Sequence, residues 1–378
     1  MTEGAAIVVG AGVMGLSAGC ALAARGVEVT LLERYTVAHE WASSHGLSRA
    51  IRHEYGSAAP YSEMVARSLP LWRSLAEETG RHLYTETGVL TLGYANDGHT
   101  MPGLDVMRGL GLPVERLTHT ECVHRFPQFR PDEYDVITWN PTGGMLHANE
   151  CLVALTERFR RLGGHLMEHS QVVSLSTDSS AATVIMADGS RRQADVAVLT
   201  AGPWVHDLVP ELHLPVRTTR QQVCYLTGLP SDQFGMVRFP VFLAAMEFYG
   251  FPVHGPGWMK VGSHVFGEAV DPNVPYVPDT NEVEAVRAFL RRTIPDASRA
   301  EVISIDRCMY DVTPDEDFIL DYYPGTKRIV VGTGFSGHGF KFGVLIGDIL
   351  AALALQTAAP VPLDRFALSR FGKGADQN

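Results

Sequence analysis

The sequence predicts a mixed α/β and α+β protein, in which a Rossmann-type dinucleotide-binding domain is interleaved with a second domain built on a mixed sheet. Three observations lead to this prediction. A strand–helix–strand pattern with a glycine fingerprint opens the chain, a strand, glycine-rich loop and helix close it, and the blocks between are richer in aromatic residues and prolines. Strands alternating with helical patterns indicate parallel βαβ units.

The opening pattern is the most specific of the three. An apolar run at residues 5–9 is followed by the motif G-x-G-x-x-G at Gly10, Gly12 and Gly15. A segment rich in alanine and leucine then leads to a second apolar run at residues 27–32. This order predicts a strand, a tight turn, a helix and a second, parallel strand.

Each glycine of this motif has a physical role in binding a dinucleotide. The first permits the tight turn, the second lets the backbone approach a pyrophosphate, and the third allows the helix to pack closely on the strand. The helix N-terminus offers free N–H groups to the phosphates. Glu33, which ends the second strand, is placed to accept the hydroxyls of the adenosine ribose. The pattern therefore predicts a dinucleotide site, but it does not separate FAD from NAD.

Later elements complete this domain. We expect an amphipathic helix at residues 147–166, because apolar residues recur there at helical spacing. We expect strands in residues 171–177 and within residues 181–205, with a turn at Asp188-Gly189, a last strand at residues 196–200 and a close backbone approach at Ala201-Gly202. Near the end, residues 328–334 read as a strand and residues 343–356 as a helix.

These elements divide the chain into alternating segments. Residues 1–82, 147–215 and 304–378 are assigned to the dinucleotide-binding domain. Residues 83–146 and 216–303 are assigned to the substrate domain. A chain of 378 residues is long enough for two such domains.

Composition argues against several classes of partner. The net charge of −11 disfavours nucleic acid and anionic membranes, because both require a basic surface. The five cysteines are widely spaced and contain no C-x-x-C pair, which indicates neither a disulfide framework nor a zinc site. No export signal or membrane-spanning run is recognised. We therefore expect a cytoplasmic protein that is a monomer or a small homo-oligomer.

Lysine is rare in this chain. Only four of its 31 basic residues are lysines: Lys260, Lys327, Lys341 and Lys373. Lys327 and Lys373 have polar surroundings, whereas Lys260 and Lys341 have almost none. A compact ammonium whose pKa responds to burial is not interchangeable with a guanidinium, which makes these two lysines candidates for function. The alternative for Lys341 is a side chain that merely extends out of an apolar segment to water.

Four separated segments resemble the monomeric sarcosine oxidase and N-methyltryptophan oxidase family of flavoproteins. They are SSHGLSRAIRHEYG from residue 43, FYGFPVHGPGWMKVGSHVFG from residue 248, CMYDVTPDEDFILD from residue 308 and GFSGHGFKFG from residue 334. The resemblance runs over essentially the whole chain in the same order. It implies the D-amino-acid-oxidase fold and an FAD cofactor.

In that family the flavin is attached through a cysteine thioether, and the matching position is Cys308. The resemblance therefore implies covalent FAD at Cys308. The alternative is that Cys308 is a small buried apolar residue, as most free cysteines are. The other residues that the resemblance and the fingerprint assign to the cofactor are Gly10, Gly12, Val13, Met14, Gly15, Glu33, Arg34, Ser44, Val173, Ala201, Gly202, Met309, Gly337, Gly339, Phe340 and Lys341.

The resemblance also assigns a substrate site. It implies that Arg52 and Lys341 hold the substrate carboxylate, and a carboxylate entering an apolar pocket does need charged, hydrogen-bonded partners. The alternative for Arg52 is a surface ion pair with Glu54 or another carboxylate. Lys260 matches the lysine that promotes the reaction of reduced flavin with oxygen, and its alternative is a strand lysine facing solvent.

Four further residues match positions of the family's pocket. Tyr249 and His264 match its pocket tyrosine and histidine. His45 and Arg49 match residues that a helical segment places near the flavin ring. For the two histidines we expect only pocket lining and charge tuning.

The resulting expectation is an FAD-dependent amine oxidase. It would oxidise a secondary amino acid, N-methyl or cyclic, to an imine that hydrolyses, with oxygen reduced to hydrogen peroxide. The loop after Tyr55 and the residues Phe248, His254 and Trp258 depart from the sarcosine-specific pattern and leave the substrate open. The alternatives are a primary, D-amino-acid or glycine oxidase, a flavin dehydrogenase with another acceptor, and a flavin-binding module without catalysis.

Overall fold

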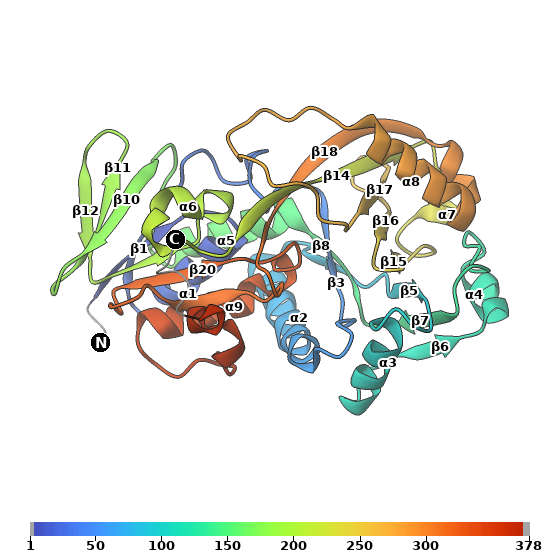
Figure 1. The fold of residues 1–378 in the computed structure, drawn as a ribbon, viewed down its shortest axis with the longest axis horizontal. Helices are drawn as coiled ribbons and strands as arrows, with labels where there is room; N and C mark the ends of the chain where they lie inside the picture. Colours follow the sequence, from blue (N-terminus) through green and yellow to red (C-terminus); the bar gives the residue numbers. More distant parts are fainter. Residues whose placement is uncertain (1–3, 373–378) are drawn as a thin grey trace.

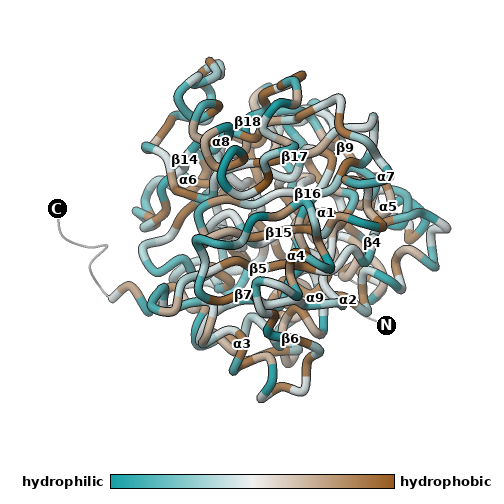
Figure 2. Tube along the Cα trace, turned by 90° about the vertical axis from the view of Figure 1, so that its right-hand side faces the viewer, coloured by the Kyte–Doolittle hydropathy of each residue, from teal (hydrophilic) through white to brown (hydrophobic). Residues whose placement is uncertain are grey.

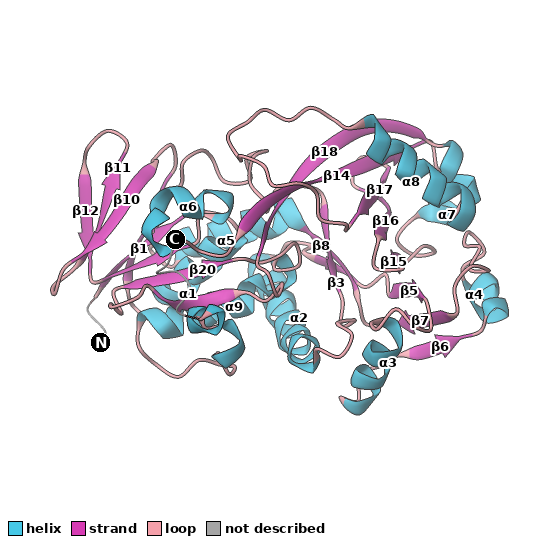
Figure 3. Ribbon diagram, in the orientation of Figure 1, coloured by secondary structure: helices cyan, strands magenta, loops and turns pink. Residues whose placement is uncertain are grey.

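The computed structural model describes residues 4–372, and Lys373 and the outer ends of the predicted ranges 1–82 and 304–378 lie outside it. Two halves are visible in the ribbon, one around a six-stranded sheet and one around an eight-stranded sheet (Figures 1 and 3). Segments from distant parts of the chain alternate between the halves, so the polypeptide passes back and forth between them.

The six-stranded sheet has the order β19-β20-β13-β1-β2-β9. Its strands are parallel except β19, which pairs antiparallel with β20. The bounds are β1 (Ala5–Val9), β2 (Glu28–Leu32), β9 (His165–Met167), β13 (Val196–Leu199), β19 (Ile319–Tyr322) and β20 (Ile329–Thr333). The strands predicted at both ends of the chain are confirmed, and they meet in one sheet.

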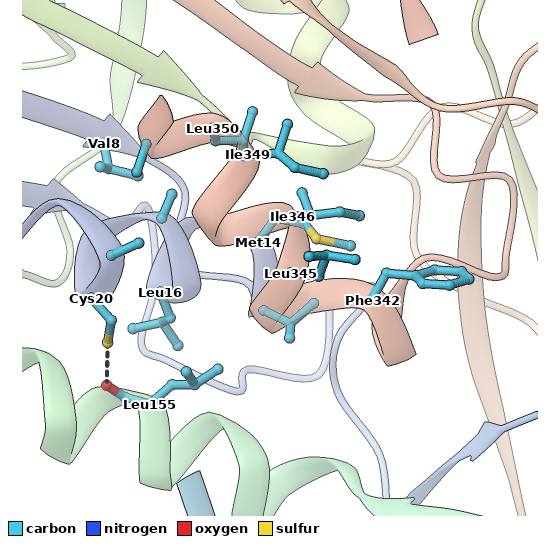
Figure 4. Packing of buried hydrophobic residues seen from close by; sticks show 14 of the residues in the cluster. Val8, Met14, Leu16, Cys20, Leu155, Phe342, Leu345, Ile346, Ile349 and Leu350 are labelled. Atoms are coloured by element: carbon cyan, nitrogen blue, oxygen red, sulfur yellow. Dashed lines mark hydrogen bonds between the residues drawn. The ribbon is translucent and has the colours of Figure 1, made fainter. Parts of the chain in front are cut away.

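Helices α1 (Val13–Ala23), α5 (Ala148–Arg161) and α9 (Gly343–Ala354) pack together on this sheet. Figure 4 shows α1 beside α9, with leucine, isoleucine and methionine side chains filling the space between them. A Cβ at Gly347 would lie 2.5 Å from the backbone of Ser17, so glycine is what lets the two helices approach so closely. Cys20 donates from Sγ to the carbonyl of Leu155 at 3.3 Å and links α1 to α5.

The helix predicted at residues 147–166 is shorter than expected. It ends at Arg161, and residues 165–167 form β9 instead. A Cβ at Gly164 would overlap the Phe159 ring at 2.1 Å, which marks the tight turn after the helix. The parallel pairing of β9 with β2 then decides the conformation of residues 165–167.

A small antiparallel sheet stands beside the six-stranded one. It consists of β10 (Val172–Thr177), β11 (Ala182–Met186) and β12 (Arg191–Ala194). The turn at Asp188 and Gly189 joins the last two strands, as predicted.

The eight-stranded sheet has the order β18-β14-β17-β16-β15-β5-β7-β6, and in Figure 2 most of these strands follow one another down the molecule. Its strands are β5 (Val89–Gly93), β6 (Glu115–Leu117), β7 (Val136–Asn140), β14 (Arg217–Thr227), β15 (Val241–Ala244), β16 (Phe248–His254), β17 (Trp258–Ser263) and β18 (Glu301–Val312). The helices of this half are α3 (Thr100–Gly109), α4 (His119–Arg125), α7 (Ser231–Phe234) and α8 (Thr280–Thr293). Strand β18 spans residue 304, where the predicted domain boundary lies.

A third, three-stranded sheet lies between the halves. It is formed by β3 (Ser48–Ile51), β8 (Gly144–His147) and β4 (Tyr84–Thr85), and the long helix α2 (Ala59–Thr79) follows β3 along the chain. The expectation that a helical segment carries His45 and Arg49 is therefore wrong. Arg49 lies on β3, which pairs with β8, and His45 lies in the turn before it.

The remaining elements are short. They are α6 (Val205–Leu208) and 3-10 turns at Gly202–Trp204, Pro210–Leu212, Pro295–Arg299, Phe340–Phe342, Asp364–Phe366 and Leu368–Phe371. Within residues 4–372, no helix has the length and apolar character needed to cross a bilayer. No group of three or more metal-ligating side chains gathers in that range either.

Candidate active site

A long cavity runs between the two halves of the molecule. One end is lined by the glycine turn after β1 and the residues that follow β2, and the other by side chains from β16, β17 and β18. Of the residues that the sequence assigned to cofactor and substrate, all but Gly15 and His45 line this cavity. The structure therefore gathers residues from widely separated stretches of the chain into one site.

The glycine turn has the geometry that the fingerprint requires. Gly10 has a φ of +97°, and a Cβ there would lie 2.5 Å from the carbonyl oxygen of Thr200. A Cβ at Gly15 would lie 1.8 Å from the carbonyl oxygen of Gly10, which explains why Gly15 packs beneath the turn and does not line the cavity. The N–H of Val13 donates to the hydroxyl of Ser44 at 3.0 Å, so Ser44 braces the start of α1.

Glu33 lies beside this turn. Its carboxylate accepts hydrogen bonds from the N–H groups of Ala11 at 2.8 Å and Tyr35 at 2.9 Å. Burial raises the pKa of Glu33, and the backbone hydrogen bonds oppose that rise. His39 stands 3.5 Å away, but burial lowers its pKa to about 4, so its imidazole is neutral near pH 7. The carboxylate is held in place by backbone donors at the position expected for a ribose partner.

The outer end of the cavity carries a basic and aromatic rim. The guanidinium carbon of Arg34 lies 5.1 Å from the Tyr35 ring centroid and 5.6 Å from that of Trp204. Val173, which also lines the cavity, is 42% exposed. Trp204 also donates to Asn273 at 3.0 Å and Arg34 donates to the same oxygen at 3.1 Å.

Lys260 is a buried residue of the cavity lining. It is 3% exposed, donates from Nζ to the carbonyl of Ser48 at 2.9 Å, and lies 5.1 Å from the Phe251 ring centroid. Burial, with the charge of Arg49, lowers the pKa of Lys260 to about 7. A solvent-facing strand lysine is therefore the wrong interpretation. Cys308, half-buried on β18, lines the same part of the cavity.

Arg49 holds the backbone around it through hydrogen bonds to carbonyl groups. Its guanidinium donates to the carbonyls of Ser43, His45 and Ser48, and packs 5.6 Å from the Phe340 ring centroid. His45 does not line the cavity, and its Nδ1 is 2.9 Å from the carbonyl of Ala38. The structure thus separates these two residues, with Arg49 on the cavity wall and His45 in the supporting turn.

Arg52, Lys341 and His264 line the part of the cavity that we call its inner end. Arg52 is 6% exposed, and its Nη1 has no hydrogen-bond partner in the described part of the chain. Because Glu54 is buried as well, a surface ion pair between the two does not fit. Lys341 is 5% exposed and donates to the hydroxyl of Tyr55 at 2.7 Å and to the carbonyl of His338 at 2.8 Å.

The electrostatics of this end favour an anion. Burial, then the charge of Arg52, holds the pKa of Lys341 well below its usual value, and Glu54 opposes that shift. Burial together with Arg52 and Lys341 lowers the pKa of His264 to about 3, so His264 is neutral. Lys341 keeps one N–H donor and Arg52 keeps Nη1 beyond the contacts described. Two buried cations with unused donors form a site suited to a carboxylate.

Two tyrosines line the cavity beside His264. Tyr249 packs edge-on against His264 at 6.3 Å, and Tyr310 lies 5.8 Å from the same imidazole. Burial raises the pKa of both phenols, so they stay protonated.

Tyr55, His338 and Asp311 are among the residues of this site that were not singled out from the sequence. Tyr55 and His338 contact Lys341 directly, and Asp311 lines the cavity from β18. Burial raises the pKa of Asp311 to about 7, and Thr218 donates to its carboxylate at 3.2 Å. All three lie inside the motifs that carry the resemblance. Their position in those motifs is the sequence signal that could have identified them.

The residues present fit an FAD. A glycine turn that leaves no room for side chains, a carboxylate held by backbone donors and the buried side chains of Arg52, Lys260 and Lys341 all line one cavity. The arrangement is that of a dinucleotide-dependent oxidoreductase, with Lys260, Arg52 and Lys341 in the lining of the same cavity.

Comparison with known proteins supports the assignment of an FAD-binding oxidoreductase. Residues 5–353 match the model of the FAD dependent oxidoreductase family, DAO. The chain is 33% identical over 374 residues to the monomeric sarcosine oxidase of Bacillus sp. (strain B-0618), covering 96% of this chain and 95% of that protein. It is 31% identical over 378 residues to the N-methyl-L-tryptophan oxidase of Yersinia pestis (strain Pestoides F), covering 97% of this chain and 98% of that protein. The chain belongs to the FAD dependent oxidoreductase family.

The similarity extends to solved structures. NikD, described as an unusual amino acid oxidase essential for nikkomycin biosynthesis, superposes with a TM-score of 0.83 at 26% identity, over 97% of this chain and 98% of that one. The D-amino-acid-oxidase fold predicted from the sequence is thereby confirmed. The chain is an FAD-dependent amine or amino-acid oxidoreductase of the sarcosine oxidase group.

Proposed function

We propose that this enzyme oxidises the C–N bond of a secondary amino acid, N-methyl or cyclic, to an imine that hydrolyses, with oxygen reduced to hydrogen peroxide. The observation that carries the proposal is the pair of buried cations, Arg52 and Lys341, at the inner end of the cavity. A carboxylate enters a buried site only where charged donors replace its water.

The residues of the chain bind, orient and isolate the substrate. Arg52 and Lys341 hold the substrate carboxylate. This fixes where the adjacent carbon and the amine nitrogen of the substrate lie in the cavity. The aromatic wall excludes water and strengthens these charges. The positive site also disfavours protonation of the amine, which must be neutral before its C–H bond is oxidised. Bound FAD supplies a two-electron acceptor for that bond.

Lys260 serves the oxygen reaction in this proposal. It is a buried ammonium on β17 held by the Ser48 carbonyl, whereas Lys341 lies in the 3-10 turn at Phe340–Phe342. A fixed positive charge stabilises the anion that forms when oxygen accepts its first electron. The carboxylate site and the oxygen site thus use separate lysines.

We also propose that the cofactor is covalent through Cys308. Replacing Cys308 by Ala should release yellow cofactor into the supernatant on acid precipitation, whereas the parent protein should keep it in the pellet. Absorbance of the supernatant measures this directly. Cys224→Ala, a buried thiol on the neighbouring strand β14, is the matched control and should behave as the parent does. Release from the parent protein would refute the linkage.

The function is tested by an anaerobic visible spectrum during titration with sarcosine, N-methyl-tryptophan, L-pipecolate, L-proline, glycine and D-alanine, followed by admission of air. Bleaching by an N-methyl or cyclic amino acid with rapid recovery in air is the expected result. Bleaching by glycine or D-alanine alone would identify a primary amino-acid oxidase. Bleaching without recovery would identify a dehydrogenase with another acceptor.

For its setting, we propose a cytoplasmic monomer or small homo-oligomer without nucleic-acid or membrane partners. The acidic net charge of −11 supports this, because it disfavours both kinds of polyanionic surface.

A further inference from the structure

A chain of hydrogen bonds leads from the inner end of the cavity to the protein surface. Lys341 Nζ donates to Tyr55 Oη at 2.7 Å, Tyr55 Oη lies 3.3 Å from His338 Nδ1, and His338 Nε2 lies 3.0 Å from the carbonyl oxygen of Glu316. Lys341 and His338 both line the cavity, whereas Glu316 is exposed. The four groups come from three separate segments of the sequence.

The chemistry of the end groups sets the direction of each bond. The Glu316 carbonyl can only accept, so the neutral His338 carries its hydrogen on Nε2 and presents a lone pair at Nδ1. Lys341 can only donate in its ammonium form, so Tyr55 Oη accepts from it and donates its own hydrogen to His338 Nδ1. Every donor therefore points from the cavity toward the surface.

The groups around Lys341, Tyr55 and His338 keep the imidazole of His338 neutral, so that it can accept a hydrogen bond from Tyr55. Arg52 and Glu54 face both Lys341 and Tyr55, and Arg52 and His264 face His338. Tyr61, bonded to Asp317 at 2.9 Å, stacks on Tyr55 at 5.0 Å. Burial and the charge of Lys341 hold the pKa of His338 well below its usual value, so its imidazole is neutral and Nδ1 accepts the hydrogen bond from Tyr55.

We infer that Tyr55 and His338 form a relay that carries the proton of the substrate ammonium from the cavity to water at Glu316. The inference rests on the proposed function, which requires a neutral substrate nitrogen. Lys341 passes one hydrogen to Tyr55 as Tyr55 passes its own to His338 Nδ1, and Lys341 takes the ammonium proton in return. His338 gives up its Nε2 hydrogen to water as Nδ1 takes up the new one. No electrons move, one proton has passed from substrate to solvent, and His338 is left with its hydrogen on Nδ1. Exchange with water returns the hydrogen to Nε2 and restores the relay before the next turnover.

The physical need for a relay follows from the charges of the site. A proton leaving the substrate would otherwise stay beside two buried cations, Arg52 and Lys341, in a region shielded from water. A hydrogen-bonded path to the surface lets the proton leave while Arg52 and Lys341 stay bound to the substrate carboxylate.

The test is the anaerobic rate of flavin reduction as a function of pH in Tyr55→Phe. This variant keeps the ring and its packing but breaks the chain. The expected rate near pH 7 is about 10- to 100-fold below that of the parent, and it rises about tenfold per pH unit as more substrate arrives with a neutral nitrogen. Tyr61→Phe, which removes a neighbouring hydroxyl outside the chain, should keep the parental profile.

A second variant and a binding measurement separate a relay from a merely structural role. His338→Gln keeps hydrogen-bonding capacity but cannot take up and pass on a proton, so it should show the same steep profile. Binding of methoxyacetate, which has an ether oxygen in place of the amine, should stay within about twofold of the parent in both variants. Its Kd is read from the perturbed flavin spectrum.

The outcomes distinguish this inference from the function on which it rests. A parental pH profile in both variants, or a rate loss that is the same at every pH, would overturn the relay. Failure of the parent protein to be bleached by any amine would overturn the proposed function instead.

Discussion

Replacing Lys260 by Met is expected to slow the reaction of the reduced protein with oxygen by about 100- to 1000-fold, while flavin reduction by substrate stays within about threefold of the parent. The magnitude is that of removing one preorganised electrostatic group from a closed site. Met matches the length of the lysine stem, so the packing against Phe251 is largely kept.

The two half-reactions are measured separately by stopped flow, first under anaerobic conditions with substrate and then by mixing the reduced protein with oxygen. Lys327→Met, at an exposed lysine, controls for the loss of one positive charge and should leave both rates unchanged. Equal losses in both half-reactions would remove the oxygen role from Lys260.

The same residue predicts a pH dependence. Because burial and Arg49 lower the pKa of Lys260 to about 7, the ammonium is charged below that pH and loses its charge above it. The oxygen reaction of the parent is therefore expected to slow as pH rises through about 7. Lys260→Met should lack this step.

The second large effect is expected at the other buried lysine. Lys341→Met should weaken the binding of methoxyacetate by about 10- to 100-fold, because a hydrogen bond to a charged group contributes about 1.5–3 kcal/mol. Equilibrium titration followed by the flavin spectrum gives the Kd. Since this ligand has a carboxylate and no amine, the measurement isolates anion binding from any proton transfer.

Two comparisons sharpen this test. Tyr55→Phe removes a partner of Lys341 but leaves its ammonium, so its Kd for methoxyacetate should stay near the parental value. The parent should favour an amino acid strongly over the amine that lacks the carboxylate, and Lys341→Met should lose much of that preference. An unchanged Kd in Lys341→Met would assign the carboxylate to other residues.

Local pattern was sufficient for the nucleotide-binding elements. The glycine spacing after residues 5–9 and the acidic end of the next strand predicted the turn and the position of Glu33, because tight turns and helix starts depend on neighbours along the chain. Lys260 could also be singled out from the sequence, because it is one of few lysines and lies in an apolar stretch.

Long-range pairing decided what local pattern could not. Arg49 was expected on a helix, but pairing of β3 with β8 makes the segment a strand, and the predicted helix at 147–166 lost its end to β9. Tyr55 and His338 lie 283 residues apart in the sequence, yet their side chains join one hydrogen-bonded chain. The sequence marked Lys341 as a rare cation in an apolar stretch, but only the folded chain surrounds it with Arg52, Tyr55 and His338, because burial and charge are properties of the assembled neighbours.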